Sequence, residues 1–177
     1  LPELTTDFGI PASVAQLTLT MTMIGMAAGQ MIMGPVSDRY GRKWPLLAGM
    51  AVFALTAFGC AAVPDIHAFL VLRFLMGFAG ASGIVIARAI ARDVAEGVEL
   101  TRFFAILMMV NGLAPILAPV IGGQVLLFSD WRGIFVLLIV VGLAQSGATM
   151  IYRETLPQEK RIENLGASFQ KFPQLLH

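Results

Sequence analysis

Long stretches without charged residues constrain this chain more than any other feature of its sequence. Four stretches contain no Asp, Glu, Lys or Arg, and a fifth contains only Arg73. An α-helix rises about 1.5 Å per residue, so about 20 apolar residues are needed to cross a hydrocarbon layer ~30 Å thick. All five stretches are that long, and they cover residues 13–36, 44–63, 66–87, 103–128 and 133–152.

The composition agrees with a lipid environment. The chain is 57% hydrophobic and 13% charged, whereas a soluble domain is about 25% charged. Five such helices are also more than a soluble protein of 19.0 kDa has the volume to bury. The sequence therefore predicts an all-α membrane protein with five transmembrane helices.

The connections between the stretches are short. They comprise residues 37–43, 64–65 and 129–132, with one longer connection at 88–102. Connections of two to seven residues join neighbouring antiparallel helices. We therefore expect an up-and-down bundle.

The basic residues predict the orientation of this bundle. Ten of the 12 Lys and Arg fall on one side of the membrane if the helices alternate in direction. Of the other two, Arg132 lies on the opposite side and Arg73 within a span. Because Lys and Arg accumulate in cytoplasmic loops, the amino end is expected outside and the carboxyl end inside. The connections at 64–65 and 129–132 are then external.

The two ends of the chain are expected to lie outside the bundle. Residues 1–12 are predicted to form an external loop, and Asp7 and Pro11, with Ser13 just after the loop, favour the start of a helix. Residues 153–177 are predicted to form a cytoplasmic linker. An external amino end without a signal-like segment suggests that an earlier span normally precedes this chain.

The stretch "GPVSDRYGRK" is a dense group of charges between two apolar spans. Its basic residues could serve only to orient the loop. That explanation does not account for Asp38 at a helix end, or for Gly34 one turn earlier, where a small residue lets another backbone approach. A carboxylate here could accept bonds from a neighbouring helix or from Arg88 or Arg92 and act as a breakable latch.

Arg73 is expected about 10 Å below the outer end of its span, seven residues after Ile66. One interpretation is that its side chain reaches back to the interface. The other is that it faces a polar cavity, because charge within a membrane is costly and usually paired. The visible spans contain no acidic partner, so the partner would be substrate, water or a carboxylate elsewhere.

The loop resembles the signature G-x-x-x-D-R-x-G-R-[KR] of the major facilitator superfamily of secondary transporters. The resemblance implies a loop between the second and third of twelve helices, so these spans would be helices two to six of the amino-terminal six-helix half. It also implies a gating role for the loop. All signature positions match: Gly34, Asp38, Arg39, Gly41, Arg42 and Lys43.

Two further motifs carry the resemblance. Arg73, Gly77 and Gly80 match R-x-x-x-G-x-x-G of the family's fourth helix, where the arginine lines the central cavity and is implicated in proton coupling. The antiporter motif of the fifth helix, G-x-x-x-G-P-x-x-G-G, is matched less fully, with Ala114 and Ala118 in place of its first two glycines. The matching residues there are Pro119, Gly122 and Gly123, preceded by Pro115 on the same helix face.

The subfamily is suggested by "RAIARDV" (88–94), "APILAPVIGG" and "DWRGIF". These segments resemble the bicyclomycin/chloramphenicol-resistance (Bcr/CflA) drug:proton antiporters. The charged residues Arg88, Arg92 and Asp93 are then candidate cytoplasmic partners of the loop. The glycines near Arg73 have a simpler interpretation as sites of close helix packing, as does the pair Gly25 and Gly29.

These patterns predict a proton-coupled multidrug efflux antiporter of the inner membrane, exporting small amphipathic compounds by alternating access. A solute importer of the same fold and a truncated, non-transporting membrane protein remain alternatives. We expect no enzymatic activity, cofactor, metal or nucleic-acid partner, and a monomer in the lipid bilayer that binds drug-like molecules and protons. The single Cys60 excludes a disulfide within the chain.

Overall fold

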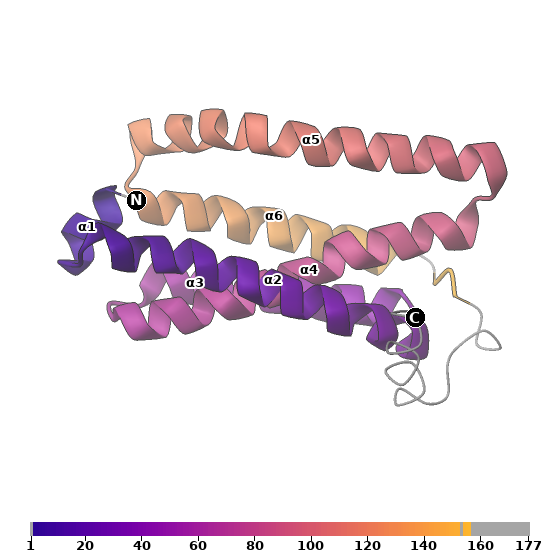
Figure 1. The fold of residues 1–177 in the computed structure, drawn as a ribbon, viewed down its shortest axis with the longest axis horizontal. Coiled ribbons are helices and arrows are strands. Elements are labelled where there is room, and N and C mark those ends of the chain that lie inside the picture. Colours follow the sequence, from indigo (N-terminus) through magenta and orange to yellow (C-terminus); the bar gives the residue numbers. More distant parts are fainter. Residues whose placement is uncertain (1, 153, 157–177) are drawn as a thin grey trace, which may run out of the picture.

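The chain folds into a set of long helices, and helices that follow one another in the sequence run antiparallel (Figure 1). A computed structural model describes residues 2–152 and 154–156. Five of the helices are long and apolar enough to cross a membrane, which confirms the predicted all-α membrane fold. The helices are α1 (Pro2–Phe8), α2 (Ala12–Tyr40), α3 (Lys43–Ala62), α4 (Ile66–Val94), α5 (Gly97–Phe128) and α6 (Trp131–Ile151).

Three helices extend by a turn or more beyond the charge-free stretches from which they were predicted. α2 continues to Tyr40, α4 continues to Val94, and α5 begins at Gly97. A charge-free stretch marks only the apolar part of a helix, whereas the backbone hydrogen bonds continue through polar residues. Asp38 and Asp93 therefore lie on helical turns beyond the apolar parts rather than in flexible loops.

The amino-terminal segment differs from the expected loop, because residues Pro2–Phe8 form the short helix α1. Leu4 and Phe8 are four residues apart and pack on one apolar cluster, so they share a helix face. Asp7, which the sequence suggested as part of a helix start, instead accepts hydrogen bonds from Trp131 Nε1 at 3.0 Å and from Arg132 at 3.3 Å. This tertiary contact holds α1 against α6.

α2 and α4 approach each other closely because glycines face the partner backbone. A Cβ atom at Gly25 would lie 2.0 Å from the carbonyl oxygen of Phe74, and one at Gly77 would lie 2.1 Å from that of Thr22. Neither distance is possible for a real side chain, so only glycine allows this contact. The packing role suggested for Gly25 and Gly77 is consistent with this geometry.

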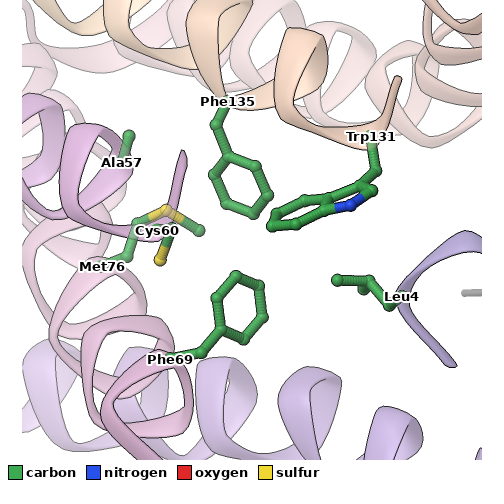
Figure 2. Packing of buried hydrophobic residues seen from close by; sticks show 7 residues of the cluster. All are labelled: Leu4, Ala57, Cys60, Phe69, Met76, Trp131 and Phe135. Atoms are coloured by element: carbon green, nitrogen blue, oxygen red, sulfur yellow. The ribbon is translucent and has the colours of Figure 1, made fainter. Parts of the chain in front are cut away.

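The apolar core lies at the end of the bundle that carries α1. Figure 2 shows Phe69 of α4 together with Trp131 and Phe135 of α6, pointing toward one another, with Leu4 beside them. The ring centroids of Phe69 and Trp131 are 5.8 Å apart in an edge-to-face arrangement, which is favourable for aromatic rings. We call this end of the molecule the aromatic end.

α5 stands apart from the other helices in Figure 1. It is continuous from Gly97 to Phe128 despite Pro115 and Pro119, and none of its residues is buried. Its apolar surface is therefore available for lipid or for further protein.

Candidate functional site

Three segments far apart in sequence meet at the other end of the bundle, around Arg42. The Arg42 side chain is only 7% exposed and pairs with Asp38 on α2 and with Asp93 on α4. Its Nε donates to Asp93 Oδ2 at 2.8 Å, and its Nη1 donates to Asp38 and, at 2.9 Å, to Ser37 Oγ. We call Asp38, Arg42, Asp93 and Glu154 the charge node.

The loop signature explains how Arg42 reaches both carboxylates. Gly41 directly follows α2 and has φ of 92°, a conformation that glycine adopts without the penalty a side chain would impose. The chain reverses there, which brings Arg42 back toward Asp38, four residues earlier. Asp93 then approaches from the last turn of α4.

Glu154 is the fourth member of the charge node, and sequence reasoning missed it. Its carboxylate accepts hydrogen bonds from the backbone N–H groups of Arg42 at 2.8 Å and Lys43 at 3.1 Å. These are the first donors of α3, which have no partner within the helix itself. The only indication in the sequence was an acidic residue shortly after the last span.

The charge balance of the node favours the charged form of Arg42. Burial by itself would lower the pKa of Arg42, but the hydrogen bonds and charges of Asp93 and Asp38 outweigh it and raise the pKa. Arg42 therefore stays protonated. Removing its carboxylate partners would leave the buried Arg42 guanidinium uncompensated, which is destabilising.

Other residues expected near the loop lie outside the node. Asp38 bonds to Arg42 and, within the described part of the chain, neither Arg88 nor Arg92 forms an ion pair with it. Arg39 lies over the ring of Tyr40, with 5.4 Å from its Cζ to the ring centroid. Lys43 donates from Nζ to the carbonyl of Met150 at 2.8 Å.

Gly34 does not mark a close backbone approach within the described residues. A Cβ atom there would meet only the Val85 side chain, at an ordinary distance of 3.9 Å. The expected close approach would require protein beyond these residues.

Arg73 packs between two aromatic rings. Its Cζ lies 5.0 Å from the centroid of Phe135 and 5.5 Å from that of Phe69, a distance at which a cation is attracted to a ring face. Its Nε is buried and has no hydrogen-bond partner among the described residues. No carboxylate of the described chain forms an ion pair with it.

A cavity of about 380 Å³ opens between α3, α4, α5 and α6. Its wall is mostly apolar, and its polar groups come from Arg88, Asn111 and Gln145. Gly80 and Gly83 of α4 also line it, whereas Arg73 is not among the lining residues. Arg88, suggested as a partner of the loop, thus faces this cavity. An apolar pocket with a few polar groups suits a small amphipathic molecule.

The antiporter-like residues of α5 lie on a surface without neighbours. A Cβ atom at Gly122 or Gly123 would meet nothing within 4 Å, and Pro115 and Pro119 are exposed. The described chain therefore does not bring these residues together with the charge node or with Arg73.

Comparison with known proteins tests the resemblance drawn from these motifs. Residues 1–176 match the family model of the Major Facilitator Superfamily. The chain is 43% identical over 99% of its length to an uncharacterised MFS-type transporter, YdgK, of Bacillus subtilis. It is 37% identical over 90% of its length to a bicyclomycin resistance protein homolog of Haemophilus influenzae.

Further matches agree with the family. The multidrug resistance protein MdtL of Klebsiella pneumoniae is 30% identical over 89% of this chain. The chain spans 44%, 40% and 40% of the lengths of these three relatives. The crystal structure of the human organic anion transporter MFSD10 has the same fold, with a TM-score of 0.71 at 20% identity, over 91% of this chain and 38% of that one.

These matches confirm the predicted superfamily and the likeness to bicyclomycin-resistance proteins. Together with five helices that can cross a membrane, they identify a multi-pass membrane protein. The chain belongs to the major facilitator superfamily of transporters.

Proposed function

We propose that this chain is part of a proton-coupled multidrug efflux antiporter that exports small amphipathic compounds across the inner membrane. The observation that carries the proposal is the 37% identity to a bicyclomycin resistance protein homolog over 90% of the chain. The similarity to multidrug resistance protein MdtL supports the same substrate class. The largely apolar cavity beside Arg88, Asn111 and Gln145 is suited to such compounds.

The charge node is proposed to act as the gate of alternating access. Asp38, Arg42 and Asp93 tie α2, the α2–α3 loop and α4 together at one end. Asp38 is 40% exposed, so it can exchange its partner more easily than a buried carboxylate. A gate of this kind closes by forming ion pairs and opens when they break.

Arg73 is proposed to couple transport to protons. An arginine in an apolar span whose Nε has no partner within the described part of the chain calls for a further polar group. A carboxylate outside the described residues would supply it, and its protonation would alter the contact with Arg73. Since the chain spans less than half of its relatives, we propose that a preceding span and a second half complete the pathway, in a monomeric transporter.

The experiment uses the complete transporter in everted membrane vesicles, with ethidium as an amphipathic probe. A proton gradient, acidic inside, should drive ethidium uptake. Asp38→Asn should lower the uptake rate about tenfold, since a charge-assisted hydrogen bond contributes about 1.5–3 kcal/mol, while ethidium binding stays unchanged. Asp130→Asn, an equal change at the opposite end of the bundle, serves as the matched control.

The alternatives predict different results. Uptake that does not depend on the proton gradient would contradict proton antiport. Net accumulation of the probe by intact cells would indicate an importer, and no transport at all would indicate a non-transporting protein. Normal transport by Asp38→Asn would mean that the loop only orients the chain in the membrane.

A further inference from the structure

Hydrogen bonds connect the beginning of α3 with the end of α6 and with the segment that follows α6. Glu154 binds the first N–H groups of α3, as described above, and its Oε1 also accepts from Leu156 N at 3.1 Å. In return, Lys43 Nζ donates to the Met150 carbonyl in the last turn of α6 at 2.8 Å. A carboxylate at a helix start and an ammonium at a helix end both complement the helix dipole.

This junction touches the gate at Arg42. The backbone N–H of Arg42 binds Glu154, while the side chain of the same residue binds Asp38 and Asp93. Gly41, immediately before it, adds little conformational restraint of its own, because the backbone of glycine is permissive. The Glu154 carboxylate therefore adds a restraint on the Arg42 backbone from outside the α2–α3 loop.

The junction also reaches Asp93 directly. Thr155 Oγ1 donates to Asp93 Oδ2 at 3.5 Å, and Leu156 is 7% exposed in the same region. The segment 154–156 thus contacts the charge node through a carboxylate and a hydroxyl, and the Leu156 side chain that follows is buried. These two contacts and the burial of Leu156 indicate that the segment is docked.

We propose that Glu154 is the positioning residue of the gate. Its carboxylate holds the Arg42 backbone at a position from which the guanidinium reaches both Asp38 and Asp93. A displacement of the segment after α6 would therefore move the Arg42 backbone and change these ion pairs. The role in gating rests on the proposed transport function, whereas the docking of the segment does not.

The docking is tested in the chain itself, without transport. A Leu156→Cys variant in a Cys60→Ala background places the single thiol on the docked segment. Its labelling by a maleimide should be slow, and Glu154→Ala should speed it about tenfold, because the loss of charge-assisted bonds frees the segment. Glu96→Gln, an exposed acidic residue of the α4–α5 connection, should leave the rate unchanged. An unchanged rate in Glu154→Ala would overturn the docking.

The positioning role is tested in the complete transporter by a double-mutant cycle. Glu154→Gln should lower the maximal ethidium transport rate about tenfold and leave KM unchanged, since Glu154 touches the gate and not the cavity. If Glu154 acts through Arg42 and Asp93, adding Asp93→Asn should slow transport no further than the slower single variant. Multiplied effects, or a raised KM with an unchanged maximal rate, would overturn the proposal.

The two tests separate the possible failures. If the wild-type transporter moves no ethidium, the proposed function fails while the labelling result still decides the docking. If transport is normal in Glu154→Gln but labelling is fast in Glu154→Ala, the segment is docked and the positioning role is wrong.

Discussion

The Arg73 side chain is stabilised by aromatic contacts but does not have all of its hydrogen bonds. Phe69 and Phe135 offer their ring faces to its guanidinium, which offsets part of the cost of placing a charge in an apolar span. The buried Nε nevertheless lacks a partner among the described residues. The aromatic rings therefore hold the guanidinium without saturating its hydrogen bonds, which the proposed coupling role requires.

Arg73→Lys distinguishes a coupling residue from an anchor. Lysine keeps the charge but lacks the planar fork of donors, so efflux by the complete transporter should fall about tenfold if a hydrogen bond to a carboxylate is lost. In Arg73→Ala, the midpoint of ethidium binding against pH should move to higher pH, because a carboxylate without its cationic neighbour keeps its proton longer. Wild-type efflux and unchanged pH profiles in both variants would leave Arg73 as an anchor.

At the scale of the helices, close packing is unevenly distributed. α2 and α4 meet through glycines whose missing side chains allow backbone contact, while α5 buries none of its residues. Helices in a membrane associate through such close packing because lipid offers no hydrophobic drive between them. α2 and α4 are therefore held together by close packing, whereas the apolar surface of α5 is available to other partners.

Gly25→Ala should weaken the packing of α2 against α4. The new methyl would lie 2.0 Å from the Phe74 carbonyl oxygen, and overpacking of this kind costs about 1–3 kcal/mol of unfolding free energy. Thermal unfolding of the purified chain can be followed with a thiol-reactive dye, since the single Cys60 is buried.

Gly122→Ala is the matched control for Gly25→Ala. A Cβ atom there meets nothing within 4 Å, and alanine favours a helix over glycine by up to about 1 kcal/mol. The control should therefore keep or raise the unfolding temperature. Equal unfolding temperatures for Gly25→Ala and the unmodified chain would mean that α2 and α4 do not pack this closely.

At the scale of the whole molecule, the two ends have different chemistry. The charge node joins the α2–α3 loop, the end of α4 and the segment after α6, whereas the aromatic end joins α1, α4 and α6 around Trp131 (Figures 1 and 2). The excess of Lys and Arg lies at the end with the charge node. By the positive-inside rule we expect this end to face the cytoplasm.

Cysteine labelling tests this orientation in intact cells, in a Cys60→Ala background. Pro64→Cys, in the exposed α3–α4 connection, should react with a membrane-impermeant maleimide added outside. Glu96→Cys, in the exposed connection at the opposite end, should react only after permeabilisation. The reverse pattern would invert the orientation, and with it the direction assigned to the gate.

The sequence alone determined the fold class, because charge-free stretches of about 20 residues or more can satisfy their backbone in lipid only as helices. It also located Asp38, Arg42 and Arg73, since charges are conspicuous against such stretches. It could not supply their partners. Arg42 pairs with Asp93 and with Glu154, which lie 51 and 112 residues further along the chain.

Tertiary structure decided these partnerships because they depend on how each helix is rotated about its axis and where it ends. In a uniformly apolar span, the sequence has no hydrophobic periodicity from which the rotation or the end of the helix could be predicted. For the same reason, the helical form of residues Pro2–Phe8 followed from the apolar surface of α4 and α6 on which Leu4 and Phe8 pack. A segment of seven residues has too few backbone hydrogen bonds to form a helix without that surface.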